Sequence, residues 1–191
     1  NNAIEGKNIC ITGAAGSIGT ELVMQVFNLN PKKIVLIDNS EMNLYSLSLK
    51  VENLNSSIPY QLVLGSSTDY KFLKELFIKN KINTVYHAAA YKHVPLVERN
   101  PIQAIYNNVF STYYLCKAAK KSQVKRVTLI SSDKAVRPTN VMGATKRLSE
   151  LILIGFANHR NTDLDFSKTN SSTIFSMVRF GNVLGSSGSV V

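Results

Sequence analysis

The hydrophobic positions of this chain form short continuous runs that alternate with segments of helical periodicity. The continuous runs predict strands at residues 7–12, 32–38, 60–65, 83–90, 126–132 and 172–180. The segments between them predict helices at residues 17–29, 41–54, 69–80, 101–122 and 142–159. Strands that are apolar throughout indicate burial on both faces, as in parallel strands covered by helices. The chain is therefore predicted to be an α/β protein with a doubly wound parallel sheet.

The composition is that of one ordinary globular domain. The chain has 191 residues, of which 45% are hydrophobic and 18% are charged. No apolar run approaches the roughly twenty residues that cross a bilayer, and no secretory signal precedes the first strand. Cys10 and Cys116 lie in apolar stretches and are expected to be reduced core thiols, and no cysteine or histidine spacing is typical of a metal site. Because the chain lacks an initiator methionine and stops in a Gly/Ser-rich stretch, we expect residues 1–191 to be part of a longer protein.

The net charge of +10 comes with lysine-rich segments at residues 71–81 and 117–126. These segments are typical of solvated helix faces. They also suit an anionic partner, such as a nucleotide or a phospholipid headgroup. Direct nucleic-acid binding is not favoured, because the basic groups are not interleaved with stacking aromatic residues.

Three glycines follow the first predicted strand and open the first predicted helix. Gly13, Gly16 and Gly19 have the spacing GxxGxxG in "TGAAGSIG". This pattern indicates a tight turn, a close approach to a pyrophosphate, and close packing of helix and strand. The helix begins beside Ser17 and Ile18, where backbone N–H groups can face phosphates. A dinucleotide cofactor is therefore expected here, and a purely structural turn is the alternative.

Asp38 closes the second predicted strand in "VLIDNS". A carboxylate at this place can accept hydrogen bonds from the two ribose hydroxyls of NAD, and it would repel a 2′-phosphate. NAD is therefore favoured over NADP. Alternatively, Asp38 caps the helix that follows.

Several motifs together resemble a known family. They are "TGAAGSIG", "HAAAYKHVPLVE", "NNVFST", "SSDKAVRPTNVMGATKR" and "RFGNVLGSSGSVV". The chain is similar to extended short-chain dehydrogenase/reductases that act on nucleotide sugars. Within them it resembles the UDP-N-acetylglucosamine 4,6-dehydratases of bacterial polysaccharide biosynthesis, above all their large membrane-anchored branch. The resemblance implies an NAD(P)-binding Rossmann fold and a cytoplasm-facing domain of an inner-membrane protein, with no membrane contact by this part of the chain.

The resemblance also implies roles for one segment. Asp133 is expected to be the acid and Lys134 the base of the dehydration, and the Ser132 hydroxyl is expected near C4 of the sugar. Lys146 is expected to hold the nicotinamide ribose. Met142 stands where most of the superfamily has a catalytic tyrosine, and methionine is usual in the large dehydratase branch. Without the resemblance, "SSDK" reads equally as a capping turn, Lys146 as a surface lysine and Met142 as a core residue.

Other residues are expected around the same cleft by resemblance. The backbone of Ala88, Ala89 and Ala90 would lie alongside the bound cofactor. The substrate-binding candidates are Lys92, Asn108, Arg179 and Asn182, with Asn108 also steadying the segment that bears the active-site lysine. His87 and His93 are expected to be structural. Ser66 and Ser67 stand where many relatives have an acidic residue that contacts adenine.

The function expected from the resemblance is NAD-dependent dehydration of a UDP-N-acetylhexosamine to a UDP-4-keto-6-deoxy sugar. A C4 or C5 epimerase of UDP-sugars shares the cofactor and the fold and stays open as an alternative. A non-catalytic NAD-binding assembly module is the alternative outside enzymes. Relatives associate through the helices that here are residues 101–122 and 142–159, so a homo-oligomer is expected.

Overall fold

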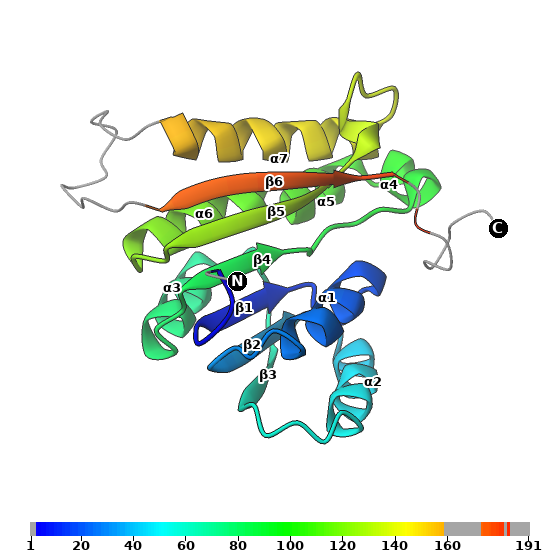
Figure 1. Cartoon of the computed structure of the whole chain (residues 1–191). Helices are drawn as coiled ribbons and strands as arrows, with labels where there is room; N and C mark the ends of the chain where they lie inside the picture. Colours follow the sequence, from blue (N-terminus) through cyan, green and yellow to red (C-terminus); the bar gives the residue numbers. More distant parts are fainter. Residues whose placement is uncertain (1–2, 159–172, 182, 184–191) are drawn as a thin grey trace.

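The chain folds into a parallel sheet with helices on both faces (Figure 1). The computed structural model describes residues 3–158, 173–181 and 183. In this part of the chain the sheet has six strands in the order β3-β2-β1-β4-β5-β6, and each neighbouring pair is parallel. The strands are β1 Asn8–Thr12, β2 Lys33–Asp38, β3 Tyr60–Leu64, β4 Thr84–His87, β5 Arg126–Ser132 and β6 Ile174–Phe180. The predicted doubly wound α/β sheet is confirmed.

Helices connect the strands and run back along the sheet. They are α1 Ser17–Phe27, α2 Glu41–Glu52, α3 Tyr70–Lys79, α4 Val94–Arg99, α5 Pro101–Ala104, the π-helix η1 Ile105–Phe110, α6 Ser111–Lys121, the 3₁₀ turn η2 Asp133–Ala135 and α7 Val141–Asn158. Among the described residues, none of these helices is long and apolar enough to cross a membrane.

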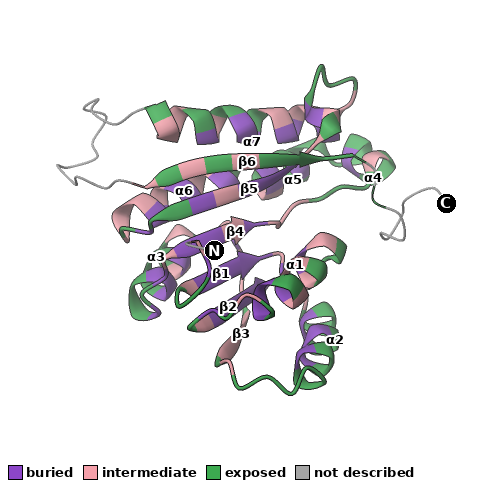
Figure 2. Ribbon diagram, viewed as in Figure 1, coloured by how far each residue is buried: buried purple, intermediate pink, exposed green. Residues whose placement is uncertain are grey.

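Two hydrophobic cores lie on the two faces of the sheet (Figure 2). Successive side chains of a strand point to opposite faces, so Ile9 and Ile11 join the core beneath α1 and α2, whereas Cys10 joins the core beneath α3 and α6. Cys10 and Cys116 are both buried free thiols, as expected. Burial on both faces explains why successive positions such as Ile9, Cys10 and Ile11 of β1 are all apolar.

The prediction that every strand is buried on both faces is wrong for β6. Phe175 and Met177 pack against the core beneath α6, but Ile174, Val178 and Phe180 are 48%, 41% and 42% exposed. The reason is that β6 lies at the edge of the sheet, and α7 packs along one side of it.

The region before β5 is less regular than one long helix over residues 101–122. It contains α5, the π-helix η1 and α6 in succession, and α4 precedes it at a place where the sequence predicts no helix. Pro95 lies in the first turn of α4 and Pro101 begins α5, and both positions suit proline because the first turn of a helix needs no N–H donor. This irregular region positions one wall of the cleft described below.

Candidate cofactor and active site

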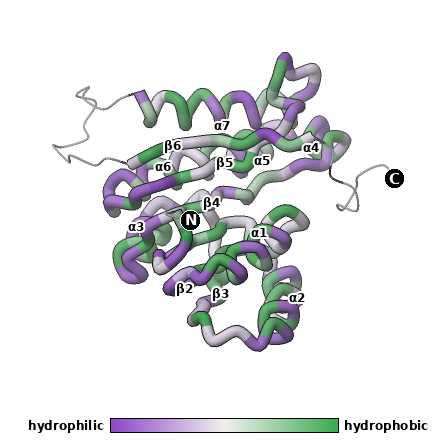
Figure 3. Tube along the Cα trace, in the orientation of Figure 1, coloured by the Kyte–Doolittle hydropathy of each residue, from purple (hydrophilic) through white to green (hydrophobic). Residues whose placement is uncertain are grey.

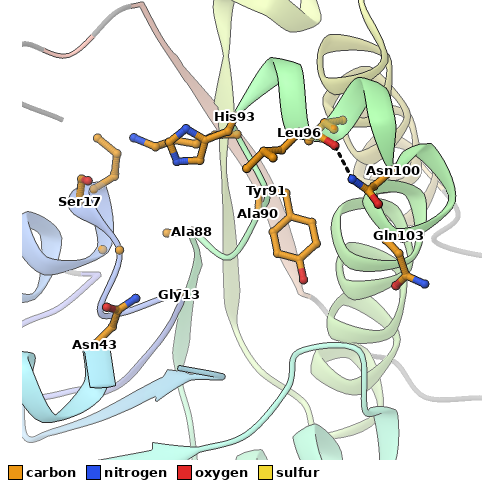
Figure 4. A pocket seen from close by; sticks show the side chains of 15 residues that line it. Gly13, Ser17, Asn43, Ala88, Ala90, Tyr91, His93, Leu96, Asn100 and Gln103 are labelled. Carbon is orange, nitrogen blue, oxygen red and sulfur yellow. Dashed lines mark hydrogen bonds between the residues drawn. The ribbon is translucent and has the colours of Figure 1, made fainter. Parts of the chain in front are cut away.

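A cleft lies at the carboxyl-terminal edge of the sheet, where the chain order reverses between β1 and β4. Two hollows of about 690 Å³ and 180 Å³ share the glycine turn after β1 and the alanine segment after β4. Figure 4 shows Gly13 and Ser17 on one side of the larger hollow, and Tyr91 and Gln103 on the other. In open α/β sheets, such a reversal of strand order is where ligands bind.

The glycine turn has the geometry that its spacing predicts. Gly13 has a φ of +65°, and a Cβ there would lie 2.5 Å from the backbone nitrogen of Ala89. A Cβ on Gly19 would lie 1.9 Å from the carbonyl oxygen of Gly13, so only glycine lets the start of α1 pack against the turn. A Cβ on Gly16 would meet protein atoms no closer than 3.4 Å. The protein itself therefore does not require glycine at Gly16, which leaves the approach of a ligand as the reason.

The first turn of α1 faces the cleft. Ser17, Ile18 and Gly19 line the larger hollow, and Gly16 at the helix N-cap has no side chain to bind the first N–H groups. The N-terminus of a helix carries a partial positive charge and favours an anion. This end of the cleft is therefore built to hold phosphates.

Asp38 lies in the smaller hollow at the end of β2. Its Oδ2 accepts a hydrogen bond from the backbone N–H of Ala15 at 3.0 Å, and its Oδ1 accepts one from Ser40 at 3.0 Å. The cap of α2 is Ser40, whose side chain accepts a hydrogen bond from Asn43. The alternative that Asp38 itself caps α2 is therefore wrong. Each carboxylate oxygen can accept more than one hydrogen bond, so Asp38 can also bind ribose hydroxyls.

The alanine segment and the serines are placed as expected around these hollows. Ala88, Ala89 and Ala90 line the smaller hollow, and Ala88 and Ala90 also line the larger one. Ser67 lines the smaller hollow beside Asp38, whereas Ser66 binds the Thr68 side chain. Ser67 is thus placed to contact the adenine side of a dinucleotide.

The end of β5 presents a compact polar turn. The Ser132 hydroxyl donates a hydrogen bond to Asp133 at 3.0 Å and accepts one from the Lys134 backbone N–H at 3.2 Å. Lys134 Nζ lies 3.6 Å from Asp133 Oδ1, and both side chains are largely accessible, 39% and 57% exposed. The hydrogen bond from Ser132 and the charge of Lys134 lower the pKa of the Asp133 carboxyl. The two residues therefore form an accessible ion pair at the sheet edge where the cleft lies, although neither lines the two hollows among the described residues.

Lys146 is buried beneath this turn and is not a surface residue. It is 9% exposed, and its Nζ donates a hydrogen bond to the Ile130 carbonyl of β5 at 3.0 Å. Burial lowers the pKa of Lys146 to about 8, although the charge of Glu150 partly opposes this shift. Burial and the Lys146 charge lower the pKa of His87 to about 3, so His87 is neutral between Thr12 and Ser111.

The lowered pKa of Lys146 predicts a pH-dependent stability. The unfolded chain keeps this proton up to the ordinary value of 10.5, whereas the folded chain releases it from about 8. Between these values the unfolded state binds more protons, so the folded state gains stability as pH rises, by up to about 3 kcal/mol. Urea unfolding should show the wild type gaining up to about 3 kcal/mol relative to Lys146→Met across this range. The comparison between the two proteins is needed because burial raises the pKa of the Cys10 and Cys116 thiols, which lowers the stability of both proteins alike as pH rises. An equal pH dependence in both proteins would contradict the assignment, because His87 and Glu150 do not titrate in this range.

Met142 packs in a small core and carries no proton chemistry. It is 3% exposed and clusters with Val97 and Ala104 between α7 and the α4–α5 region. Its inclusion among candidate catalytic residues is therefore corrected to a packing role, because its thioether is enclosed by apolar side chains and cannot transfer a proton.

Asn108 joins three segments and is not available to a substrate. Its Oδ1 accepts a hydrogen bond from the Tyr91 N–H at 2.7 Å, and its Nδ2 donates to the Tyr91 carbonyl and the Thr145 hydroxyl, each at 3.0 Å. It is 2% exposed within the π-helix η1. The substrate-binding role is therefore corrected, whereas the expected steadying of the helix that bears Lys146 agrees with these bonds.

Arg179 is held by a partner that sequence reasoning missed. Glu150 has no exposed side-chain surface and accepts two hydrogen bonds from Arg179, both at 2.7 Å. It also accepts one from Ser131 at 2.7 Å and one from Arg147 at 3.1 Å. Burial raises the pKa of Glu150, but these donors outweigh it and lower the pKa to about 2. Arg179 thus ties β6 to α7, and its contact with substrate stays a prediction.

The feature of the sequence that could have indicated Glu150 is its spacing from Lys146. It lies four residues after Lys146, so both side chains project from the same face of α7. That face lies over the end of β5, where Ser131 and Ile130 bind them. Gly143 was missed as well: a Cβ there would lie 2.4 Å from the Lys134 carbonyl oxygen, so glycine lets the polar turn sit directly on α7.

The remaining candidates are spread around the cleft. Lys92 and His93 line the larger hollow, and both are exposed. Asn182 lies outside the described residues. Within the described part of the chain, no group of three histidine, cysteine or carboxylate side chains could hold a metal ion.

These features define the class of the protein. A parallel sheet in the order 3-2-1-4-5-6, a glycine turn after β1 and a carboxylate at the end of β2 make it a Rossmann-type dinucleotide-binding domain of the short-chain dehydrogenase/reductase kind. The family described as polysaccharide biosynthesis protein matches residues 9–191. The chain therefore belongs to this family.

Individual relatives agree with the family. The capsular polysaccharide biosynthesis protein CapD of Staphylococcus aureus is 41% identical over 98% of this chain and 30% of its own length. A UDP-N-acetylglucosamine 4,6-dehydratase (inverting) of Campylobacter jejuni is 34% identical over 97% of this chain and 52% of its own length. The chain thus spans a third to a half of these relatives.

Solved structures share the fold. The structure of Pen from Bacillus thuringiensis is 34% identical, with a TM-score of 0.86 over 98% of this chain and 56% of that chain. Other structures of the same fold, 20% to 21% identical, contain bound NAD, among them a UDP-glucose 4-epimerase.

Proposed function

We propose that this chain is the NAD-binding domain of a nucleotide-sugar 4,6-dehydratase that acts on a UDP-N-acetylhexosamine, with UDP-N-acetylglucosamine as the expected substrate. The observation that carries the proposal is the placement of an accessible Asp133–Lys134 ion pair at the same sheet edge as the glycine turn. The identity to a dehydratase along nearly the whole chain supports it. The product would be a UDP-4-keto-6-deoxy sugar for polysaccharide synthesis.

The residues that line the cleft favour one orientation of bound NAD. Phosphates would lie over the first turn of α1, and the ribose hydroxyls of adenosine would bind Asp38 in the smaller hollow. A 2′-phosphate would meet the Asp38 carboxylate and be repelled, which favours NAD over NADP. NAD, when bound, supplies the hydride acceptor for C4 of the sugar and then the hydride donor for C6.

The ion pair is one proton transfer away from the form that dehydration needs. Loss of water across C5 and C6 requires a base for the C5 proton and an acid for the C6 hydroxyl. At rest Asp133 is a carboxylate and Lys134 an ammonium. A substrate that excludes water disfavours both charges, so moving the proton from Lys134 to Asp133 gives a neutral amine as base and a carboxylic acid as acid. The total number of protons does not change.

The neighbours of the pair support the other steps. Ser132 lies directly before Asp133, and its hydroxyl with ordered water is the proposed route for the C4 hydroxyl proton in place of the missing tyrosine. The Lys146 ammonium, which donates a hydrogen bond to the Ile130 carbonyl, would also bind the hydroxyls of the nicotinamide ribose. Lys92, exposed at the larger hollow, is a candidate for a contact with UDP phosphates. Arg179 and Asn182 stay candidates for contacts with phosphate or amide groups of the substrate.

The wider setting is also part of the proposal. Apolar side chains are exposed on η1 and α7, among them Phe110, Leu148 and Leu151, and such faces favour contact between subunits. We therefore expect a homo-oligomer. From the family resemblance we also expect this chain to be a cytoplasm-facing domain of a membrane protein.

Incubating the full-length protein with UDP-N-acetylglucosamine in deuterated water tests the function. The C5 proton passes to solvent during dehydration, so the 4-keto-6-deoxy product should carry deuterium at C5. A C4 epimerase would instead interconvert sugar isomers without exchange at C5, and an assembly module would leave the sugar unchanged. Either of these last two outcomes would overturn the dehydratase assignment.

A further inference from the structure

A row of exposed basic side chains lies along the edge of the sheet opposite the cofactor cleft. All parallel strands begin at this edge, and the helices that precede β4 and β5 end there. We call this surface the basic edge. It consists of Lys7, Lys32, Lys79, Lys81, Lys125 and Arg126.

Hydrogen bonds to backbone carbonyls place these residues on one continuous surface. The Lys32 N–H donates to the Lys7 carbonyl at 2.9 Å, which joins the entrances of β1 and β2. Asn8 Nδ2 donates to the Lys81 carbonyl at 3.1 Å, which joins β1 to the α3–β4 turn. The Lys125 N–H donates to the Asn83 carbonyl at 2.9 Å, which joins β4 to β5. The turn between α6 and β5, which carries Lys125, is largely hydrophilic (Figure 3).

The basic side chains of this edge outnumber the carboxylates near it. Among the described residues, none of the six basic side chains forms a salt bridge. The carboxylates Asp38, Asp69 and Asp133 lie at the opposite edge, where strands end and α3 begins. Among the described residues, the carboxylates near the basic edge are Glu5, Glu52 at the end of α2, and Glu75 one turn before Lys79. Six basic side chains against these three carboxylates leave the edge with a net positive charge.

The basic edge does not serve the cofactor cleft. Strands of four to seven residues separate the two edges by roughly 13 to 23 Å. Charges on the surface are screened beyond about 8 to 10 Å at ordinary ionic strength. A ligand in the cleft would therefore gain little from these lysines.

We propose that the basic edge docks on the surface of an anionic phospholipid bilayer. Charges spread along an open edge suit a field of headgroups better than a single bound ligand, because each lysine or arginine near such a surface adds attraction independently. Ile78 is 53% exposed directly before Lys79 and offers an apolar side chain to the bilayer interface. Among the described residues, the exposed aromatic side chains that could stack on nucleic-acid bases do not belong to the basic edge; they are Tyr45, Tyr91, Tyr106, Phe110 and Phe180. The family resemblance implied no membrane contact by this part of the chain, and the vesicle experiment below decides between the two.

Docking in this way would direct the cleft away from the bilayer, toward the water from which a soluble nucleotide sugar arrives. This consequence rests on the proposed function, but the docking does not. The two fail separately, because lipid binding is measured without cofactor or sugar.

Vesicle co-sedimentation tests the proposal with the 191-residue chain. We expect binding to vesicles of phosphatidylcholine mixed with phosphatidylglycerol, loss of binding at high salt, and none to pure phosphatidylcholine. The double variant Lys81→Gln/Lys125→Gln should bind about 25-fold more weakly, from roughly five-fold for each charge removed. The control Lys71→Gln/Arg99→Gln removes the same charge from exposed helix positions away from this edge and should bind like the wild type.

Thermal unfolding of both double variants checks that they fold equally well. An equal loss of binding in the two would overturn the proposal, because net charge alone would then explain the attraction. Binding to neutral vesicles, or no binding to anionic ones, would overturn it too. Tighter binding to a single-stranded oligonucleotide that the basic-edge variant loses would assign the edge to nucleic acid instead.

Discussion

Replacing Lys134 with arginine is expected to lower dehydration by about 10²- to 10⁴-fold, the usual contribution of a positioned acid or base, and to leave NAD binding unchanged. Arginine keeps the positive charge beside Asp133, so the ion pair at the end of β5 can still form. A guanidinium does not release its proton in proteins, so no neutral base becomes available for the C5 proton. Product formation by the full-length protein and NAD titration of the same sample measure the two effects.

Lys71→Arg is the matched control for this variant, because it makes the same exchange at an exposed position on α3. It should turn over like the wild type. If Lys134→Arg also keeps wild-type turnover, Lys134 is not the base and the proposed proton transfer within the ion pair is wrong.

Gly13→Ala is expected to abolish NAD binding and to destabilise the fold by about 2 to 5 kcal/mol. Two costs add here. The φ of +65° costs a residue with a Cβ about 1 to 2 kcal/mol. The new methyl group would also lie 2.5 Å from the Ala89 backbone, and relieving such overpacking costs about 1 to 3 kcal/mol. Because the turn must move away from the alanine segment, the phosphate site is distorted as well.

Gly6→Ala separates these costs. Gly6 has the same φ of +65°, but a Cβ there would have nothing within 4 Å. It should therefore lose only the backbone part of the stability and bind NAD normally. Thermal unfolding and NAD titration of both variants make the comparison. Equal effects of the two substitutions on NAD binding would show that the contact between the turn and Ala89 does not shape the site.

Local patterns were enough to predict the framework. The strands are apolar because both faces of the central sheet are covered, and the glycines are spaced by the steric needs of one turn. These features depend on neighbours in sequence or on a simple layered architecture. The positions of Gly13, Gly19 and Asp38 could therefore be predicted before any contact was known.

Long-range contacts explain what was missed. Glu150 looks like an ordinary helix carboxylate until β5 and β6 bring Ser131 and Arg179 against it. Asn108 has the composition of a substrate contact, but its amide is occupied by Tyr91 and Thr145. Strand pairing and helix packing decide both cases, and no periodicity in the sequence reports them.

Titration of the 191-residue chain with NAD and with NADP tests the central claim most directly, that the turn between β1 and α1 with Asp38 forms an NAD site. Calorimetry should show saturable binding of one NAD for each chain and distinctly weaker binding of NADP, because the 2′-phosphate meets the Asp38 carboxylate. No saturable binding of either dinucleotide, or tighter binding of NADP, would contradict the account.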